Sequence, residues 1–186
     1  MVKRRRLNRE AVIEKAAVLA DEAGSVTAVS LTTLADALEI RPPSLYNHIA
    51  SVEDLHYGLT VYGLRQLLAD LRQASLGLVG RDALMAMAGA YRDFARAHPA
   101  VYPLTIRAPL PEQAELAALS QEMLQMLLLM MASLGLQGDD AIHAIRGLRA
   151  ILHGFCSLEA AEGYKMALDL NESFRRLVWA YMDGLT

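Results

Sequence analysis

The chain is 186 residues long and has a formal net charge of −3, which excludes a polycation that binds nucleic acid through bulk charge alone. Its composition is 54% hydrophobic but only 6% aromatic, and Ala, Leu and Met dominate, which favours an all-α protein over a sheet protein. A single cysteine, Cys156, excludes an internal disulfide framework and suits a reducing compartment, so we expect a cytoplasmic protein.

The N-terminal arm is basic. Residues 1–50 carry seven Lys and Arg against six acidic residues, whereas the rest of the chain carries eleven against fifteen, and the excess lies in residues 3–6. A solvated tail and an arm that contacts nucleic acid both fit this spacing. We expect no signal peptide, because Glu10, Glu14 and Asp21 interrupt the apolar run that such a peptide needs.

The first helix is predicted between Asn8 and Ala23. Asn8 is a favoured N-cap residue, and Gly24 supplies the left-handed conformation that ends many helices. The apolar residues between these two signals recur at intervals of three and four, so one face of the helix lies against a core. These residues are Val12, Ile13, Ala16, Leu19, Ala20 and Ala23.

The stretch Leu31–Leu55 has the pattern of a helix-turn-helix. A short apolar-periodic helix follows the cap Ser30, a three-residue turn follows at 39–41, and Pro42 and Pro43 begin a second short helix. Proline suits a first turn because the backbone N–H that it lacks would have no partner there. In the second helix Leu45 and Ile49 face the core, and four residues point away from it: Ser44, Tyr46, Asn47 and His48.

A long helix and a bundle of further helices complete the chain. Ser51 and Asp54 form a capping box at the start of the long helix, which runs to about Ala74. Prolines limit residues 99–111 to short turns or one brief helix. The other helices are predicted at 81–98, 111–134, 139–161 and 171–182, with Asn171 as the cap of the last one.

The predicted helix at 111–134 is almost apolar on all sides near Met126–Met131, so we expect it to be central in the bundle. Its most apolar run, Met126–Ala132, is far shorter than the roughly 20 residues that a membrane-spanning helix needs. The expected fold is therefore all-α, with an N-terminal helix-turn-helix domain of three helices followed by a C-terminal helical bundle.

Residues 9–57 resemble the DNA-binding domain of the tetracycline-repressor (TetR) family of bacterial one-component regulators. The resemblance implies a DNA-binding domain at 1–50, basic arm included, and a C-terminal domain at 51–186 that binds a ligand and dimerises. Four features carry it: the early helix that ends at Gly24, the segment Leu31–Ala35, the segment Pro43–Ile49, and Ser51 with Glu53–Leu55.

Two positions depart from the pattern of the family. The family usually has Phe where this chain has Ile49, which is a tolerable exchange in a core. It usually has Lys where this chain has Val52, and that Lys normally contacts a DNA phosphate. The resemblance therefore implies weaker binding to the DNA backbone at this position, which the basic arm can offset.

A second resemblance lies further along the chain. The segment Leu152–Phe155, followed by Leu158 and Glu159, is similar to a signature of the TetR subgroup whose C-terminal domain is named for a Trp-His-Gly triplet. Leu152 stands where the subgroup has the tryptophan. The resemblance to this subgroup therefore rests on fewer residues than the resemblance to the family.

The outward face of the helix-turn-helix carries side chains that suit DNA. Asn can form two hydrogen bonds with adenine, and Tyr and His reach a phosphate or a thymine methyl group. Thr near a helix N-terminus suits a phosphate, because free backbone N–H groups and the helix dipole favour an anion there. An ordinary solvated helix face is the alternative, but the tight turn, the paired prolines and the family pattern together favour DNA. The expected DNA contacts are Arg4, Arg5, Arg6, Thr32, Thr33, Arg41, Pro43, Ser44, Tyr46, Asn47 and His48.

Catalytic chemistry has little support in the sequence. The five histidines show no metal-ligand spacing with each other or with Cys156, and there is no glycine-rich phosphate loop and no nucleophile elbow. We therefore expect no catalytic residue, no metal and no cofactor. His153 fits either a ligand contact or a hydrogen-bonded core residue. Cys156 fits a buried inert thiol better than a redox sensor, because no cluster of basic residues surrounds it.

An apolar pocket is expected in the C-terminal bundle. Methionine side chains repack easily and suit loosely specific ligands, although a methionine stripe at helical spacing also fits an ordinary core. The resemblance implies an effector site between the long helix that follows the helix-turn-helix and the middle helices. The expected ligand contacts are Tyr62, Tyr91, Phe94, Met126, Met130 and His153.

The last two predicted helices carry more apolar residues than the edge of a bundle should leave in water. We expect these helices to pair across a twofold axis into a four-helix interface. The residues concerned are Ile142, Ile145, Leu148, Leu152 and Phe155 on one helix and Phe174, Leu177, Val178 and Tyr181 on the other.

The sequence thus predicts a ligand-responsive transcriptional regulator, which in this family is usually a repressor. We expect a homodimer that binds a palindromic double-stranded DNA operator and is released by a small apolar effector. The alternative is a helical-bundle carrier of an apolar ligand, in which the N-terminal motif only packs and binds no DNA. Binding to a palindromic duplex distinguishes these two functions.

Overall fold

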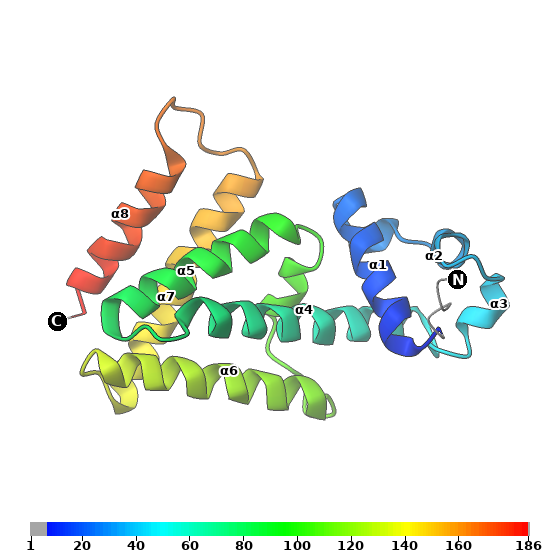
Figure 1. Ribbon diagram of the computed structural model, residues 1–186, viewed down its shortest axis with the longest axis horizontal. Helices are drawn as coiled ribbons and strands as arrows, with labels where there is room; N and C mark the ends of the chain where they lie inside the picture. Colours follow the sequence, from blue (N-terminus) through cyan, green and yellow to red (C-terminus); the bar gives the residue numbers. More distant parts are fainter. Residues whose placement is uncertain (1–6, 186) are drawn as a thin grey trace. The chain divides into compact units, whose positions relative to one another are not determined.

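The computed structural model describes residues 7–185, and within that range the chain is all-α, with no strand (Figure 1). The predicted fold class is confirmed. The contacts expected from Arg4, Arg5 and Arg6 lie outside the described residues. The helices are α1 Arg9–Ala23, α2 Leu31–Ala37, α3 Pro42–Leu45, α4 Val52–Ser75, α5 Gly80–Ala97, α6 Ala114–Ser133, α7 Gly138–Ala160 and α8 Leu170–Asp183, with 3₁₀ helices at Val26–Ala28 and Tyr102–Ile106.

Local capping signals place several helix ends where the sequence predicts them. The Asn8 Oδ1 atom accepts a hydrogen bond from the Ala11 N–H at 2.8 Å, and Gly24 ends α1 with a φ of 69°. At the start of α4, Ser51 Oγ accepts a hydrogen bond from the Asp54 N–H at 3.1 Å. These ends follow the sequence because each cap bonds to a backbone group within three residues.

The start of α8 differs from the prediction. Asp169 is the N-cap, and its Oδ1 atom accepts a hydrogen bond from the Asn171 N–H at 2.9 Å. The prediction that Asn171 caps this helix was wrong. Two residues of N-cap type stand two positions apart here, and the spacing of the apolar residues does not distinguish them.

The described chain divides into two compact units. The first combines residues 7–65 with 98–116, and the second combines residues 66–97 with 117–185. Both α4 and α6 therefore begin in the first unit and end in the second. The assignment of DNA binding to residues 1–50, and of ligand binding and dimerisation to residues 51–186, concerns the roles of these segments and stays a prediction.

The core of the first unit joins α1, the helix-turn-helix and the first half of α4. Val12 and Ala16 of α1 are fully buried, together with Leu34 of α2 and Leu45 of α3. Val101 lies in the same core and is also fully buried, although it follows α5 in the chain. Each buried Val or Leu stabilises the folded unit by about 1.5–3 kcal/mol relative to an exposed position.

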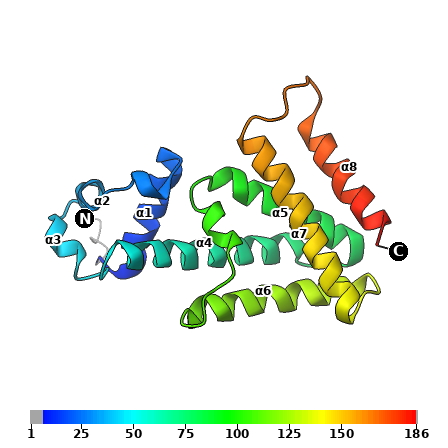
Figure 2. The same cartoon turned by 180° about the vertical axis from the view of Figure 1, so that it is seen from behind.

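The core of the second unit is built from α5, α7 and α8, with Met131 of α6. Figure 2 shows α7 and α8 from behind, connected by the loop at 161–169. Most of the apolar residues that we expected at a dimer interface lie in this core, so the prediction that they leave apolar surface in water was wrong. The buried ones are Ile145, Leu148, Leu152, Phe155, Phe174 and Val178. Pairing of the two helices across a twofold axis stays a prediction.

The helix α6 is less buried than its sequence predicts. Only Leu116 and Met131 of its residues are buried, and Leu129 is 74% exposed. The expectation of a central helix was wrong, because apolar residues on all sides of a helix do not ensure a neighbour on all sides. The whole of α6 has the length and apolar composition of a membrane span, which is weak support for one because core helices of soluble proteins share them.

Two ion pairs connect α4 with α6. Arg65 pairs with Glu115 at 2.6 Å in the first unit, and Arg72 pairs with Glu122 in the second. The partners stand seven residues apart on each helix, so both pairs lie on the same face. All four side chains are more than two-fifths exposed, and each pair therefore contributes only about 0–1 kcal/mol.

Candidate nucleic-acid interface

The turn between α2 and α3 is tight. Glu39 adopts a φ of 56°, and the Ile40 N–H returns to donate a hydrogen bond to the Ala35 carbonyl at 3.0 Å. Arg41 is extended, with φ −80° and ψ 143°, as a residue before proline should be. Pro42 then begins α3 with its φ already suited to a helix. The sequence predicted this turn but not the left-handed residue within it.

The helix α3 is a single turn, and a second turn at 46–48 continues it. The Ile49 N–H donates to the Leu45 carbonyl at 3.0 Å, which brings both side chains to the same side. Leu45 is fully buried and Ile49 is 1% exposed, so the predicted inward face is confirmed. Burial of Leu45 and Ile49 holds this stretch of backbone in place, and it therefore also fixes the direction of the outward residues between them.

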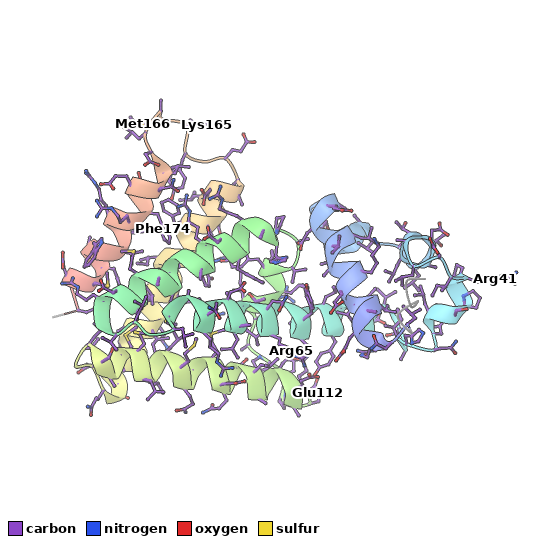
Figure 3. All side chains as sticks on the ribbon, viewed as in Figure 1. Arg41, Arg65, Glu112, Lys165, Met166 and Phe174 are labelled. Carbon is purple, nitrogen blue, oxygen red and sulfur yellow. The ribbon has the colours of Figure 1, made fainter. Side chains whose placement is uncertain are left out.

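The outward face presents the expected DNA contacts in two degrees of exposure. Tyr46 is 58% exposed, and Asn47 beside it is exposed as well. Arg41 and Pro43 are exposed at the start of α3, and the Arg41 side chain extends away from the helices (Figure 3). The remaining two residues, Ser44 and His48, are half-buried. Their roles toward DNA remain predictions.

Two further expected contacts lie on the first turn of α2. Thr32 and Thr33 are both exposed. The Thr33 N–H already donates a hydrogen bond to Ser30 Oγ at 3.0 Å, and the hydroxyl oxygens of Ser30 and Thr33 lie 2.8 Å apart. Ser30 therefore engages both the backbone N–H and the hydroxyl group of Thr33.

A clamp that the sequence did not predict holds the end of the helix-turn-helix. The Arg9 guanidinium donates to both carboxylate oxygens of Asp54, at 2.6 and 2.7 Å, and to the His48 carbonyl at 3.1 Å. The same carboxylate accepts a hydrogen bond from the Ala50 N–H at 2.8 Å. The bonds from Arg9 lower the pKa of Asp54 below its ordinary value. We therefore regard this clamp as the main polar support of the turn at residues 46–48.

The start of α4 lacks one basic contact that the family usually has. Val52 is the first residue of α4, and its side chain is 44% exposed. An aliphatic side chain cannot neutralise a phosphate, so this position contributes no counterion release on DNA binding. Before α3, the arginine nearest to Val52 in the sequence is Arg41, and its side chain is exposed.

The expected ligand contacts are divided between the two units. Tyr62 on α4 is half-buried and packs against the core of the first unit. Tyr91 on α5 and Met130 on α6 are half-buried against the core of the second unit, and Phe94 on α5 is buried. The last two, Met126 on α6 and His153 on α7, are half-buried in the second unit. Their roles toward a ligand remain predictions.

A buried arginine is the main polar feature in the second unit. Arg92 on α5 is 6% exposed and donates two hydrogen bonds to the Glu159 carboxylate, at 2.8 and 2.6 Å. Its third nitrogen donates to Asn171 Oδ1 at 3.0 Å. Its guanidinium lies about 5 Å from the ring centroids of Phe155 and Phe174, the latter labelled in Figure 3. The group is fully engaged, so we interpret it as a connection between α5, α7 and α8.

Cys156 lies beside this group and is buried. Burial raises the pKa of its thiol to about 11, and the nearby carboxylate of Glu159 acts in the same direction. A thiol with so high a pKa carries almost no thiolate at neutral pH, which favours an inert core residue over a redox sensor. Residues 7–185 also contain no cluster of three or more His, Cys, Asp or Glu side chains that could hold a metal ion.

Comparison with known proteins identifies the family. Residues 84–181 match the family model of the tetracyclin repressor-like C-terminal domain. The chain is 32% identical over 180 residues to YobS of Bacillus subtilis, which is named as an HTH-type transcriptional regulator, and the match covers 96% of this chain and 93% of YobS. It is 31% identical over 181 residues to Rv0681 of Mycobacterium tuberculosis, which bears the same description, with 97% and 82% of the two chains covered.

Solved structures show the same fold at lower identity. A protein of unknown function from Rhodococcus sp. RHA1 superposes with a TM-score of 0.78 at 22% identity, covering 99% of this chain and 98% of the other. BioQ with its double-stranded DNA operator superposes with a TM-score of 0.68 at 20% identity, covering 97% and 98%. The family model and the two relatives together show that the chain belongs to the tetracycline-repressor family of helix-turn-helix transcriptional regulators.

Proposed function

We propose that the protein is a cytoplasmic repressor that binds a palindromic operator as a homodimer and is released by a small apolar effector. The observation that carries the proposal is the turn at residues 46–48, which we call the reading turn. Tyr46 and Asn47 are exposed side by side, on a backbone fixed by buried Leu45 and Ile49. An exposed phenol and amide on so rigid a support suit the edge of a base and a neighbouring phosphate.

Contacts to the DNA backbone complete the proposed interface. Arg41 at the start of α3 and the hydroxyl groups of Thr32 and Thr33 are exposed, and each suits a phosphate oxygen. Arg4, Arg5 and Arg6 are assigned to the same backbone or to the minor groove. That BioQ, which shares this fold, was crystallised with its operator supports the proposal.

Dimerisation is typical of the family, and we assign it here to α7 and α8. Most apolar residues of these helices are buried in the core of the second unit, so the interface would use the outward face of α7. Ala150 on that face is exposed, and a Cβ added at Gly154 would meet no heavy atom within 4 Å. Small residues at these positions allow a second helix to approach closely. A twofold axis there would place one reading turn on each half-site of a palindrome.

The effector is assigned to the apolar surface of α6 and its neighbours in the second unit. Leu124, Leu127 and Met130 are only half-buried although they pack against the core of that unit. Surface of this kind loses water when an apolar molecule covers it, and methionine adapts to its shape. An effector of higher affinity for one conformation would shift the protein toward it, and α4 would carry the change to the reading turn.

Selection of DNA from a random duplex pool tests the proposed function. The full-length protein should enrich one palindromic sequence and bind it more tightly than a scrambled duplex by about a thousandfold or more. Deletion of residues 2–6 should make the slope of log affinity against log salt shallower by about 0.9 for each phosphate that the arm neutralises. Enrichment of no sequence would contradict the proposal and would favour the apolar-ligand carrier.

A further inference from the structure

Asp21 connects the end of α1 to a segment far along the chain. Its Oδ1 atom accepts hydrogen bonds from the Ala100 N–H at 3.0 Å and the Val101 N–H at 3.2 Å. Its Oδ2 atom lies 2.8 Å from His98 Nδ1. The Asp21 side chain is only 13% exposed. One carboxylate thus engages three groups of a segment that follows it by about eighty residues.

The segment that Asp21 holds is inserted in the core of the first unit. Val101 is fully buried, and Ala100 is 5% exposed. The backbone of α4 comes so close that a Cβ added at Gly63 would lie 2.5 Å from Val101 Cγ1 and 3.1 Å from Thr105 Cγ2. Residues 98–106 therefore form a wedge in contact with α4 and fixed to α1 by one carboxylate. Figure 2 shows this segment between the end of α5 and the start of α6.

The N-terminal end of the wedge follows directly on the last residue of α5, which belongs to the second unit. The chain leaves the second unit at Ala97 and returns to it at Ala117. Residues 98–101 are therefore the first residues of the first unit after α5. Asp21 bonds them to α1, and Arg9 at the other end of α1 donates a hydrogen bond to the His48 carbonyl of the reading turn.

We propose that Asp21 is a positioning residue for DNA reading, which fixes the C-terminal end of α1 to residues 98–101 of the wedge. This inference rests on the proposed function. In a dimer, the spacing of the two reading turns would then depend on the Asp21 hydrogen bonds as well as on α4. Loss of these hydrogen bonds would broaden the range of distances between the two reading turns, without changing any side chain that contacts DNA.

Three variants separate positioning from mere stability. Asp21→Ala removes all three interactions. Asp21→Asn keeps an oxygen for the Ala100 and Val101 N–H groups and should behave like the wild type. Glu22→Ala is the matched control, because it removes an exposed carboxylate from the next position of the same helix. Hydrogen exchange of the full-length protein should show faster exchange of the Ala100 and Val101 amides in Asp21→Ala alone.

The DNA experiment uses the palindrome selected by the wild type, the same palindrome with its half-sites moved by two base pairs, and one half-site alone. For Asp21→Ala the preference for the selected spacing over the altered one should fall about tenfold, with half-site affinity unchanged. Equal weakening on all three duplexes, or an unchanged preference, would overturn the inference. So would unchanged exchange at residues 100 and 101. A wild type that selects no palindrome would instead overturn the proposed function.

Discussion

At the scale of single residues, Arg9 shows how one side chain can support a turn that it does not belong to. It pairs with Asp54 and with the His48 carbonyl, so it joins α1 to the first turn of α4 and to the link between α3 and α4. Its side chain is 42% exposed and that of Asp54 is 27% exposed, so solvent screens part of the attraction. The two parallel hydrogen bonds nevertheless make the pair stronger than a typical surface pair.

We predict that Arg9→Met lowers the free energy of unfolding by about 1 kcal/mol at pH 7. The pKa of Asp54 is lowered in the folded state, so its contribution is complete above the ordinary carboxyl range and is lost as the pH falls through the lowered value. The difference between wild type and variant in urea unfolding should therefore shrink below about pH 4. Arg65→Met, which removes an exposed pair in the same unit, is the control and should change stability by less than about 0.5 kcal/mol. A pH-independent difference would contradict this account.

Cys156 gives a second prediction at this scale. Burial raises the pKa of its thiol to about 11, so roughly one thiol in ten thousand is ionised at pH 7. A colorimetric disulfide reagent should therefore not react with the native protein over an hour and should react fully once urea unfolds it. Rapid reaction of the native protein would show that the thiol is accessible and would favour a redox sensor.

Sequence reasoning succeeded at this scale where the partners are close in the chain. Asn8 bonds three residues ahead, and the capping preference of Asn is enough to predict that bond. The Arg9–Asp54 pair spans 45 residues, and no local pattern marks it. In the sequence, Asp21 stands out only as a charge that interrupts an apolar run. Long-range polar interactions depend on how the helices pack, which composition and periodicity do not give.

At the scale of the elements, close packing of α4 against the wedge makes Gly63 sensitive. A Cβ there would approach Val101 Cγ1 to 2.5 Å, inside the contact distance of two carbon atoms. In contrast, a Cβ at Gly89 in α5 would meet no heavy atom within 4 Å. The two positions lie in helix interiors but differ in their surroundings.

We predict opposite effects for the same substitution at these two glycines. Gly63→Ala should destabilise the protein by about 1–3 kcal/mol through overpacking. Gly89→Ala should stabilise it by up to about 1 kcal/mol, because Ala loses less backbone entropy in a helix than Gly does. Urea unfolding followed by circular dichroism measures both. If the two variants shifted the midpoint in the same direction, the close approach of α4 to Val101 would be in doubt.

Helix existence and type followed from the sequence more reliably than helix placement. Periodicity and breakers located all the long helices, because each ends at a Gly, a Pro or a cap. The expectation of a central α6 failed, because the apolar surface of Met126–Met131 says nothing about which neighbours cover it. The residues of the last two helices are more buried than predicted: Leu148 and Phe174, for example, were expected at the surface and lie in the core.

At the scale of the whole molecule, one chain offers one short reading turn, which gives little affinity alone. The family is typically dimeric, and a palindrome needs two turns held at a fixed distance. We predict that light scattering at micromolar concentration gives about twice the mass of one chain. Gly154→Leu, which fills the open face of α7, should lower that mass toward the monomer, whereas Leu76→Ala at an exposed site beyond α4 should not. A wild-type monomer would refute the dimer, and a dimeric Gly154→Leu would move the interface elsewhere.

The organisation into two units could be predicted only in part. The helix-turn-helix and its function followed from Leu31–Leu55, because a short motif fixes its own geometry. The insertion of residues 98–116 into the first unit could not be foreseen, since prolines there indicate only irregular chain. The expected ligand contacts stay a prediction, because a pocket depends on how helices pack, which periodicity does not give, and Tyr62 belongs to a different unit from Tyr91.

The central claim is that the turn after α3 reads DNA, and the most direct measurement is the affinity of Tyr46→Ala/Asn47→Ala for the selected palindrome. Both side chains are exposed, so the double variant should fold like the wild type. Fluorescence anisotropy at fixed salt should show its affinity reduced by about a hundredfold, with binding to a scrambled duplex nearly unchanged. Affinity for the palindrome equal to that of the wild type would contradict the assignment of this turn as the reader.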